Sequence, residues 1–125
     1  MATNSLDAVI QDLVIANRIL AKEDVVDAYG HVSMRHPDNS SYFLIARSVA
    51  PELVTADDIV ELDLDGQPGR DEKRTLYLER FIHAAIFEAR PEIMAVVHAH
   101  AEDTLPFGVA DATKLRPVIL SLYRS

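Results

Sequence analysis

The chain has 125 residues, of which 12 are Lys or Arg and 20 are Asp or Glu, and its formal net charge is −8 at pH 7. This acidic balance argues against nucleic acid or an anionic membrane as a partner. The chain has no cysteine, which excludes disulfides, thiolate metal sites and cysteine nucleophiles. We expect a single domain over residues 1–125 and, since no signal peptide or membrane-spanning run is present, a cytoplasmic location.

The first half of the chain is predicted to form one helix followed by strands. Apolar residues recur at helical spacing over residues 5–22, which indicates an amphipathic helix. Residues 31–35 and 42–46 are predicted to form a hairpin, because a Pro-Asp-Asn-Ser turn separates two strand-like runs. Residues 59–64 alternate apolar and acidic side chains, a pattern typical of a half-exposed strand.

The second half is predicted to return to a helix and then a strand. Apolar residues at helical spacing indicate a helix over about residues 76–89, which ends before a proline. A β-rich apolar run predicts a strand over residues 93–98, and a short segment over residues 102–107 follows. Residues 115–122 are apolar and could add a strand.

Glu79, His98 and His100 form the pattern most indicative of chemistry. Two histidines at positions i and i+2 of an extended segment point to the same side, so His98 and His100 could bind one cation. We expect their ring nitrogens to lie about 3 to 3.5 Å apart, for ligands each ~2.1 Å from a zinc ion. A carboxylate from Glu79 would then leave coordination positions open, as catalytic metal sites require. A His-x-His pair can also be a pair of surface histidines at a strand end.

Four other polar residues have simpler interpretations. His83 lies one helical turn after Glu79, and we expect it either on the surface or in a supporting role behind the ligands. His36 precedes a proline in the hairpin turn and is expected to face solvent, whereas Tyr29 is expected to be a packing residue. Arg35 is expected to pair with an acidic residue across the hairpin.

Taken in order along the chain, these motifs resemble the class II aldolase/adducin-head family. The matching segments are Tyr-Gly-His-Val-Ser-Met-Arg at 29–35, Ala-Arg-Ser at 46–48, Glu79, and Ala-Val-Val-His-Ala-His at 95–100. The resemblance implies an α/β fold of three layers, α/β/α, around a mostly antiparallel sheet, assembled as a homotetramer with sites at subunit boundaries. It also implies a divalent ion, zinc or else manganese, iron or cobalt, held by His98, His100 and a third histidine from the C-terminal half, with Glu79 as ligand or general acid/base.

The resemblance further implies a small-molecule substrate that is a carboxylate or a hydroxy-carbonyl compound. Gly30, His31, Arg47 and Ser48 are the residues it places on the substrate side, and a cation and a hydroxyl near a metal suit a carboxylate. Sugar-phosphate aldolases of the family carry a Ser-Ser pair for phosphate where this chain has Tyr77-Leu78. The Gly-His-Val-Ser form resembles the branch that includes decarboxylases of hydroxylated aromatic acids.

Three hypotheses follow for the function. The first is a metal-dependent carbon–carbon lyase, with a decarboxylase favoured over an aldolase. The second is a non-catalytic assembly module of the adducin-head type. The third is a truncated chain with a broken site, because no histidine follows His100. The third ligand would then lie in a C-terminal part of the family fold, after Ser125.

Overall fold

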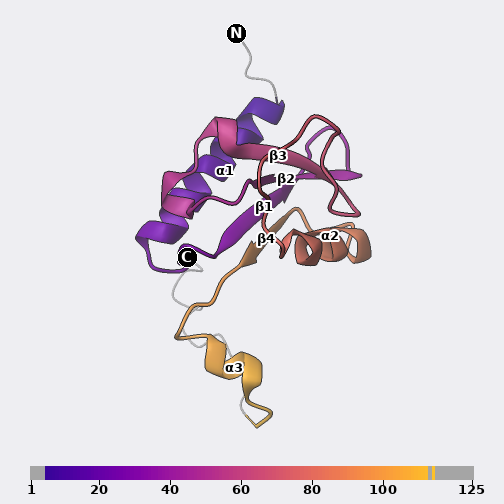
Figure 1. Ribbon diagram of the computed structural model, residues 1–125. Helices are drawn as coiled ribbons and strands as arrows, with labels where there is room; N and C mark the ends of the chain where they lie inside the picture. The colour runs from indigo at the N-terminus through magenta and orange to yellow at the C-terminus, as the bar shows by residue number, and fades with distance from the viewer. Residues whose placement is uncertain (1–4, 113, 115–125) are drawn as a thin grey trace, which may run out of the picture.

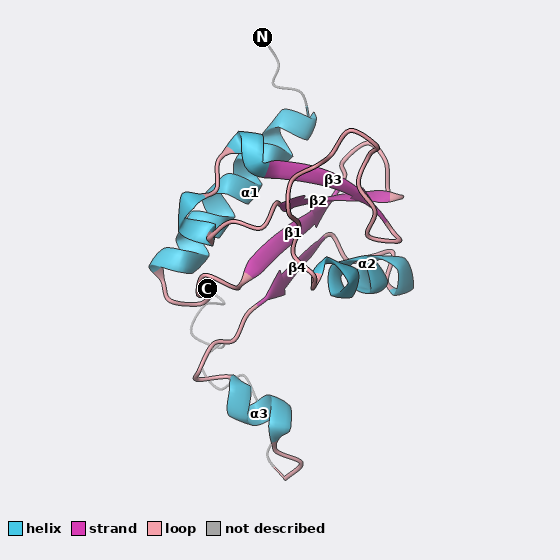
Figure 2. Ribbon diagram, in the orientation of Figure 1, coloured by secondary structure: helices cyan, strands magenta, loops and turns pink. Residues whose placement is uncertain are grey.

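The computed structural model describes residues 5–112 and 114, and within them a sheet lies between two helices (Figure 1). Helix α1 (Ser5–Lys22) covers one face, and helix α2 (Arg80–Ala89) covers the other (Figure 2). Four strands are described: β1 (His31–Arg35), β2 (Tyr42–Ala46), β3 (Ile59–Asp63) and β4 (Ala95–His98). Their order is β3-β2-β1-β4, and each adjacent pair is antiparallel. The expected three-layer fold with its antiparallel sheet is confirmed.

Strand alternation explains the two cores on either side of the sheet. Val32 and Leu44 point to one face, where they pack against Leu13 of α1. Phe43 and Ile45 point to the other face and join Phe87 of α2 in the larger core. The Phe43 and Phe87 rings lie 5.2 Å apart between centroids. The hairpin thus contributes residues to both layers.

Most predicted elements are present, with shifted boundaries in the second half. The first helix and the hairpin strands have the predicted limits, and β3 ends one residue early. Helix α2 begins four residues later than predicted, and β4 begins two residues later. The short segment predicted at 102–107 is helix α3 (Leu105–Val109), which lies away from the sheet and has no buried residue (Figure 1). The strand predicted at 115–122 falls outside the described residues.

Helix α2 starts later than predicted because the residues before it are hydrogen-bonded to the loop that follows β2. The Ser48 N–H donates to the Thr75 carbonyl at 2.8 Å. The Tyr77 hydroxyl donates to the Val49 carbonyl and accepts from the Val49 N–H. These long-range bonds hold residues 75–77 extended, so apolar periodicity alone could not locate the helix start.

Arg35 does not pair with an acid across the hairpin, and that prediction is wrong. Its guanidinium is buried and donates to four backbone carbonyls that lie around the ends of β4 and α2. The acceptors are the carbonyls of Ser40 at 2.7 Å, Phe87 at 2.8 Å, Ile93 at 3.1 Å and Arg90 at 3.2 Å. Arg35 therefore links the hairpin turn, the C-terminal end of α2 and the start of β4.

We expect Arg35→Ala to lower the free energy of unfolding by about 3 kcal/mol or more, because it leaves buried carbonyls without donors. Urea-induced unfolding measures the loss. Arg90→Ala is the control, since the Arg90 side chain, within the described part of the chain, pairs with exposed Glu92 alone, and its loss should cost no more than about 1 kcal/mol. Equal losses in the two variants would contradict this role for Arg35.

His36 is also more enclosed than predicted. Its Nε2 lies 3.2 Å from Glu61 Oε2, and its side chain is 11% exposed. The Asp38 N–H donates to His36 Nδ1 at 3.1 Å. The turn therefore encloses this ring, and the expectation that it faces solvent is wrong.

Among the described residues, no helix combines the length and the apolar character needed to cross a membrane.

Candidate metal centre

The register of β1 and β4 brings two of the candidate histidines together. His31 is the partner of His98 in this antiparallel pair, so both rings lie on the α2 face of the sheet. The rings are stacked, with centroids 4.8 Å apart and planes 14° apart. Gly30 permits this approach, because a Cβ there would lie 2.4 Å from Val26 Cβ and 3.2 Å from the His98 carbonyl oxygen. The structure thus gives Gly30 a packing role, and its contact with substrate stays a prediction.

His98 and His100 converge at the end of β4. Their Nε2 atoms lie 3.2 Å apart, which confirms the expected separation of about 3 to 3.5 Å. An ion about 2.1 Å from each nitrogen would be bound at an angle of roughly 100°, close to tetrahedral. The pair therefore fits one divalent ion.

Glu79 lies immediately before α2, and in the described part of the chain it groups with His98 and His31, a group that does not include His100. The potential ligand atoms of His31, Glu79 and His98 all lie within 4.8 Å of one another. Imidazole nitrogens with a carboxylate oxygen suit zinc and the other divalent metals predicted for the site. Sequence reasoning placed His31 on the substrate side, which stays a prediction, and it did not foresee that His31 lies this close to Glu79 and His98.

His31 is supported from behind by two buried residues. His31 Nδ1 lies 2.7 Å from His83 Nε2, and His83 Nδ1 lies 2.6 Å from Ser33 Oγ. His83 is fully buried, so a surface position is excluded and the supporting position is the one observed. Burial lowers the pKa of His31 to about 4 and that of His83 to about 3, with the charge of nearby histidines as a smaller cause. Both rings are therefore neutral at pH 7.

Sequence reasoning missed Ser33, although a signal for it exists. Ser33 follows His31 by two residues on the same strand, so alternation places both side chains on the α2 face. His83 shares the buried stripe of α2 with Phe87, four residues later. These two periodicities could have predicted that β1 and α2 bring the three polar side chains into one buried group.

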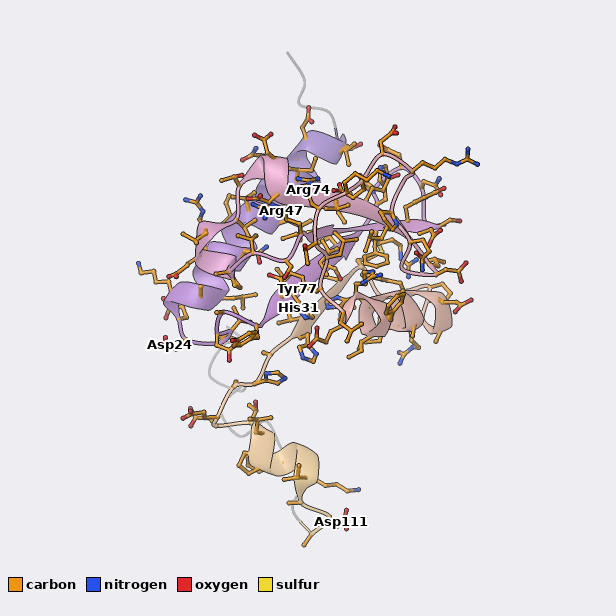
Figure 3. The ribbon with its side chains drawn as sticks, in the orientation of Figure 1. Asp24, His31, Arg47, Arg74, Tyr77 and Asp111 are labelled. Carbon is orange, nitrogen blue, oxygen red and sulfur yellow. The ribbon has the colours of Figure 1, made fainter. Side chains whose placement is uncertain are left out.

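The predicted substrate residues are divided between two neighbouring regions. Ser48 lines a cavity of about 340 Å³ together with Tyr29, Tyr77, Leu78 and Glu79. Tyr29 is 74% exposed, so its predicted packing role is wrong. The Tyr77 ring lies against His31, with centroids 4.6 Å apart, as Figure 3 shows. The cavity therefore opens directly beside the candidate metal ligands.

Arg47 lies outside that cavity lining. Its Nε donates to Asp58 Oδ1 at 2.7 Å, while its Nη groups have no hydrogen bond among the described residues. The pKa of Asp58 is lowered mainly by the Thr55 N–H and further by the Thr55 hydroxyl and Arg47. Arg47 is thus anchored at one nitrogen, and its contact with substrate stays a prediction.

Known proteins resemble the chain over most of its length. A family model for the Class II Aldolase and Adducin N-terminal domain matches residues 11–123. Decarboxylase tropJ of Talaromyces stipitatus is 40% identical over 103 residues, covering 81% of this chain and 38% of that protein. The 3,4-dihydroxyphthalate decarboxylase of Arthrobacter keyseri is 32% identical over 117 residues, covering 86% of this chain and 46% of that protein.

A solved structure extends the comparison to the fold. The L-fuculose 1-phosphate aldolase from Glaciozyma antarctica PI12 superposes with a TM-score of 0.68 at 29% identity, covering 81% of this chain and 45% of that one. The chain thus spans less than half the length of each of these three proteins.

Proposed function

Since the chain belongs to the class II aldolase and adducin N-terminal domain family, we propose that its protein is a divalent-metal-dependent carbon–carbon lyase, and specifically a decarboxylase of a hydroxylated aromatic carboxylic acid. The observation that carries this proposal is the convergence of His98 and His100, whose Nε2 atoms lie 3.2 Å apart, with a ligand atom of Glu79 within 4.8 Å of one of His98. The relatives tropJ and 3,4-dihydroxyphthalate decarboxylase, both named as decarboxylases, support the reaction type.

His98, His100 and Glu79 are the residues that would hold the ion, with zinc proposed first. A bound divalent ion would stabilise the negative charge that develops on an oxygen next to the reacting carbon. We propose that a further histidine, from a part of the protein after residue 125, completes the ligand set. The neutral imidazoles leave most of the ion's charge available for this task.

The remaining roles belong to side chains around the cavity. In its protonated form, the Glu79 carboxyl can deliver the proton that replaces carbon dioxide on the ring carbon, and the carboxylate left behind takes up a proton again before the next turnover. Ser48 can donate its hydroxyl hydrogen to the substrate carboxylate, and the Nη groups of Arg47 could form a second contact. His31 lies against the Tyr77 ring beside this cavity, and its Nε2 is buried without a partner among the described residues.

The lining of the cavity supports an unphosphorylated aromatic substrate. Tyr29, Leu78 and the Tyr77 ring give it apolar and aromatic surface, and the Tyr77 hydroxyl is already bonded to the Val49 backbone. A phosphate carries close to two negative charges and needs several donors. Among the described lining residues, the side chains of Ser48 and Tyr29 each have one hydroxyl free to donate, which is fewer donors than a phosphate needs.

The test is carbon dioxide release by the complete zinc-loaded protein that contains this chain. We expect release from a dihydroxybenzoate-type acid and little cleavage of a phosphorylated ketose. Retro-aldol cleavage of the sugar phosphate, with no carbon dioxide from any hydroxylated aromatic acid, would instead establish the aldolase alternative. The similarity to L-fuculose 1-phosphate aldolase is what favours that alternative.

We also propose a homotetramer in the cytoplasm, with the sites at subunit boundaries. Leu78 next to Glu79 is 75% exposed, and Phe81 and Ile82 on the first turn of α2 are also exposed. Apolar side chains gathered beside a site support a neighbouring subunit there. A protein that assembles through these apolar residues, and whose His98, His100 and Glu79 bind no metal, would match the adducin-like assembly module.

A further inference from the structure

Ser33, His83 and His31 form one buried hydrogen-bonded chain that ends at the candidate metal centre. All three side chains are buried, and their polar atoms are separated by 2.6 and 2.7 Å. The last atom of the chain, His31 Nε2, is buried and has no partner among the described residues. A buried polar atom without a partner in a native structure calls for an explanation in terms of a ligand or function.

The direction of the hydrogen bonds decides what His31 presents to the site. If the Ser33 hydroxyl donates to His83 Nδ1, then His83 carries its hydrogen on Nε2 and donates to His31 Nδ1. His31 must then carry its own hydrogen on Nε2. In the opposite direction, His31 would carry its hydrogen on Nδ1 and offer a lone pair at Nε2, and the Ser33 hydroxyl hydrogen would have no acceptor.

The surroundings of Ser33 Oγ and His31 Nε2, the two ends of the hydrogen-bonded chain, favour the direction in which the Ser33 hydroxyl donates to His83. Ser33 Oγ has His83 as its sole hydrogen-bond partner among the described residues, and its side chain has no exposed surface. Because Ser33 is buried, a hydroxyl hydrogen without a protein acceptor could not bond to solvent instead, and it would cost about 1–3 kcal/mol. At the other end, potential ligand atoms of His31 and Glu79 lie within 4.8 Å of one another, so a carboxylate acceptor is close to the His31 ring.

We propose that Ser33 and His83 are positioning residues that hold His31 as the tautomer with its hydrogen on Nε2, so that His31 is a hydrogen-bond donor to a substrate oxygen and not a metal ligand. The two short contacts support this, because the 2.7 Å between His31 Nδ1 and His83 Nε2 and the 2.6 Å between His83 Nδ1 and Ser33 Oγ must each contain one hydrogen. The acceptor would be a carboxylate or phenolate oxygen, and this identification of the acceptor alone rests on the proposed function.

The test is a two-bond 1H–15N correlation spectrum of protein labelled with 15N-histidine at pH 7, without zinc and with one equivalent of zinc. We expect His31 and His83 to be protonated at Nε2 in the metal-free protein. Zinc should shift Nε2 of His98 and His100 and leave the His31 assignment unchanged. A His31 hydrogen on Nδ1, or a metal-type shift of His31 Nε2, would overturn the proposal.

Matched variants separate this positioning role from a merely structural one. Ser33→Ala should remove the tautomer preference of His83 and His31, whereas Ser33→Thr, which keeps the hydroxyl, should retain it. His36 is the internal reference, because Asp38 N–H donates to its Nδ1 and so places its hydrogen on Nε2 in every variant. If folded Ser33→Ala protein kept the His31 tautomer unchanged, this would contradict the proposal that the Ser33 hydroxyl sets that tautomer through His83.

The wild-type spectrum decides the tautomer even if a variant fails to fold. It is also independent of turnover. If the protein has the expected tautomers but no lyase activity, the proposed function is refuted and the positioning role of Ser33 and His83 is kept. If the protein is an active lyase but His31 carries its hydrogen on Nδ1, the proposed function is kept and the positioning role of Ser33 and His83 is refuted.

Discussion

Replacing His98 by alanine will lower the affinity for zinc by more than about 100-fold, because loss of a direct ligand exceeds the 10–100-fold cost of losing an outer partner. The fold should lose little stability, since the His98 side chain is half-buried at the end of β4. His100→Ala should behave in the same way. Zinc content after dialysis, by elemental analysis, measures binding, and urea-induced unfolding measures stability.

His36→Ala is the matched control for this experiment. It also removes a histidine from the chain, but His36 contacts Glu61 of β3 and not the candidate ligands. Its zinc content should equal that of the wild type. If His98→Ala and His100→Ala retained full zinc content as well, the metal site would have to be placed elsewhere in the protein.

Glu79→Gln will lower turnover of the complete protein by about 100- to 10,000-fold if Glu79 transfers the proton, because general acid/base catalysis contributes factors of that size. Glutamine keeps the shape and can still contact the ion through its carbonyl oxygen. Zinc content should then stay near the wild-type level while kcat falls. If Glu79 is primarily a ligand, zinc content and turnover should fall together.

Glu88→Gln provides the control, since it makes the same change at an exposed position of α2. It should leave both zinc content and turnover unchanged. Glu79→Gln protein with wild-type turnover and wild-type zinc content would remove Glu79 from the site and leave the histidines as the sole candidates in the described part of the chain.

The hairpin and the first helix could be predicted because their signals are local. Alternation in residues 31–35 and 42–46 fixes which side chains share a face, and the intervening turn residues fix the pairing. The meeting of His98 with His100 was predictable for the same reason, since the two residues are close in sequence.

The features that sequence reasoning got wrong or left open depend on contacts between distant segments. Three of the four carbonyls that Arg35 binds are more than 50 residues away, so the sequence near Arg35 could not reveal these partners. The late start of α2 depends on the bonds between Tyr77 and Val49. The burial of His83 depends on α2 packing over Ser33 of β1.

The pairing of His31 with His98 has a consequence for how the family can vary in length. If the connection between α2 and β4 lost one residue, β4 could slip by one position, and Val97 would replace Val96 in the core. One valine would substitute for another at that core position. His98 would turn to the α1 face, because a one-residue slip reverses every side chain. Selection on the length of residues 90–94 would therefore act through the histidine as well as through the Arg90 and Ile93 carbonyls that Arg35 binds.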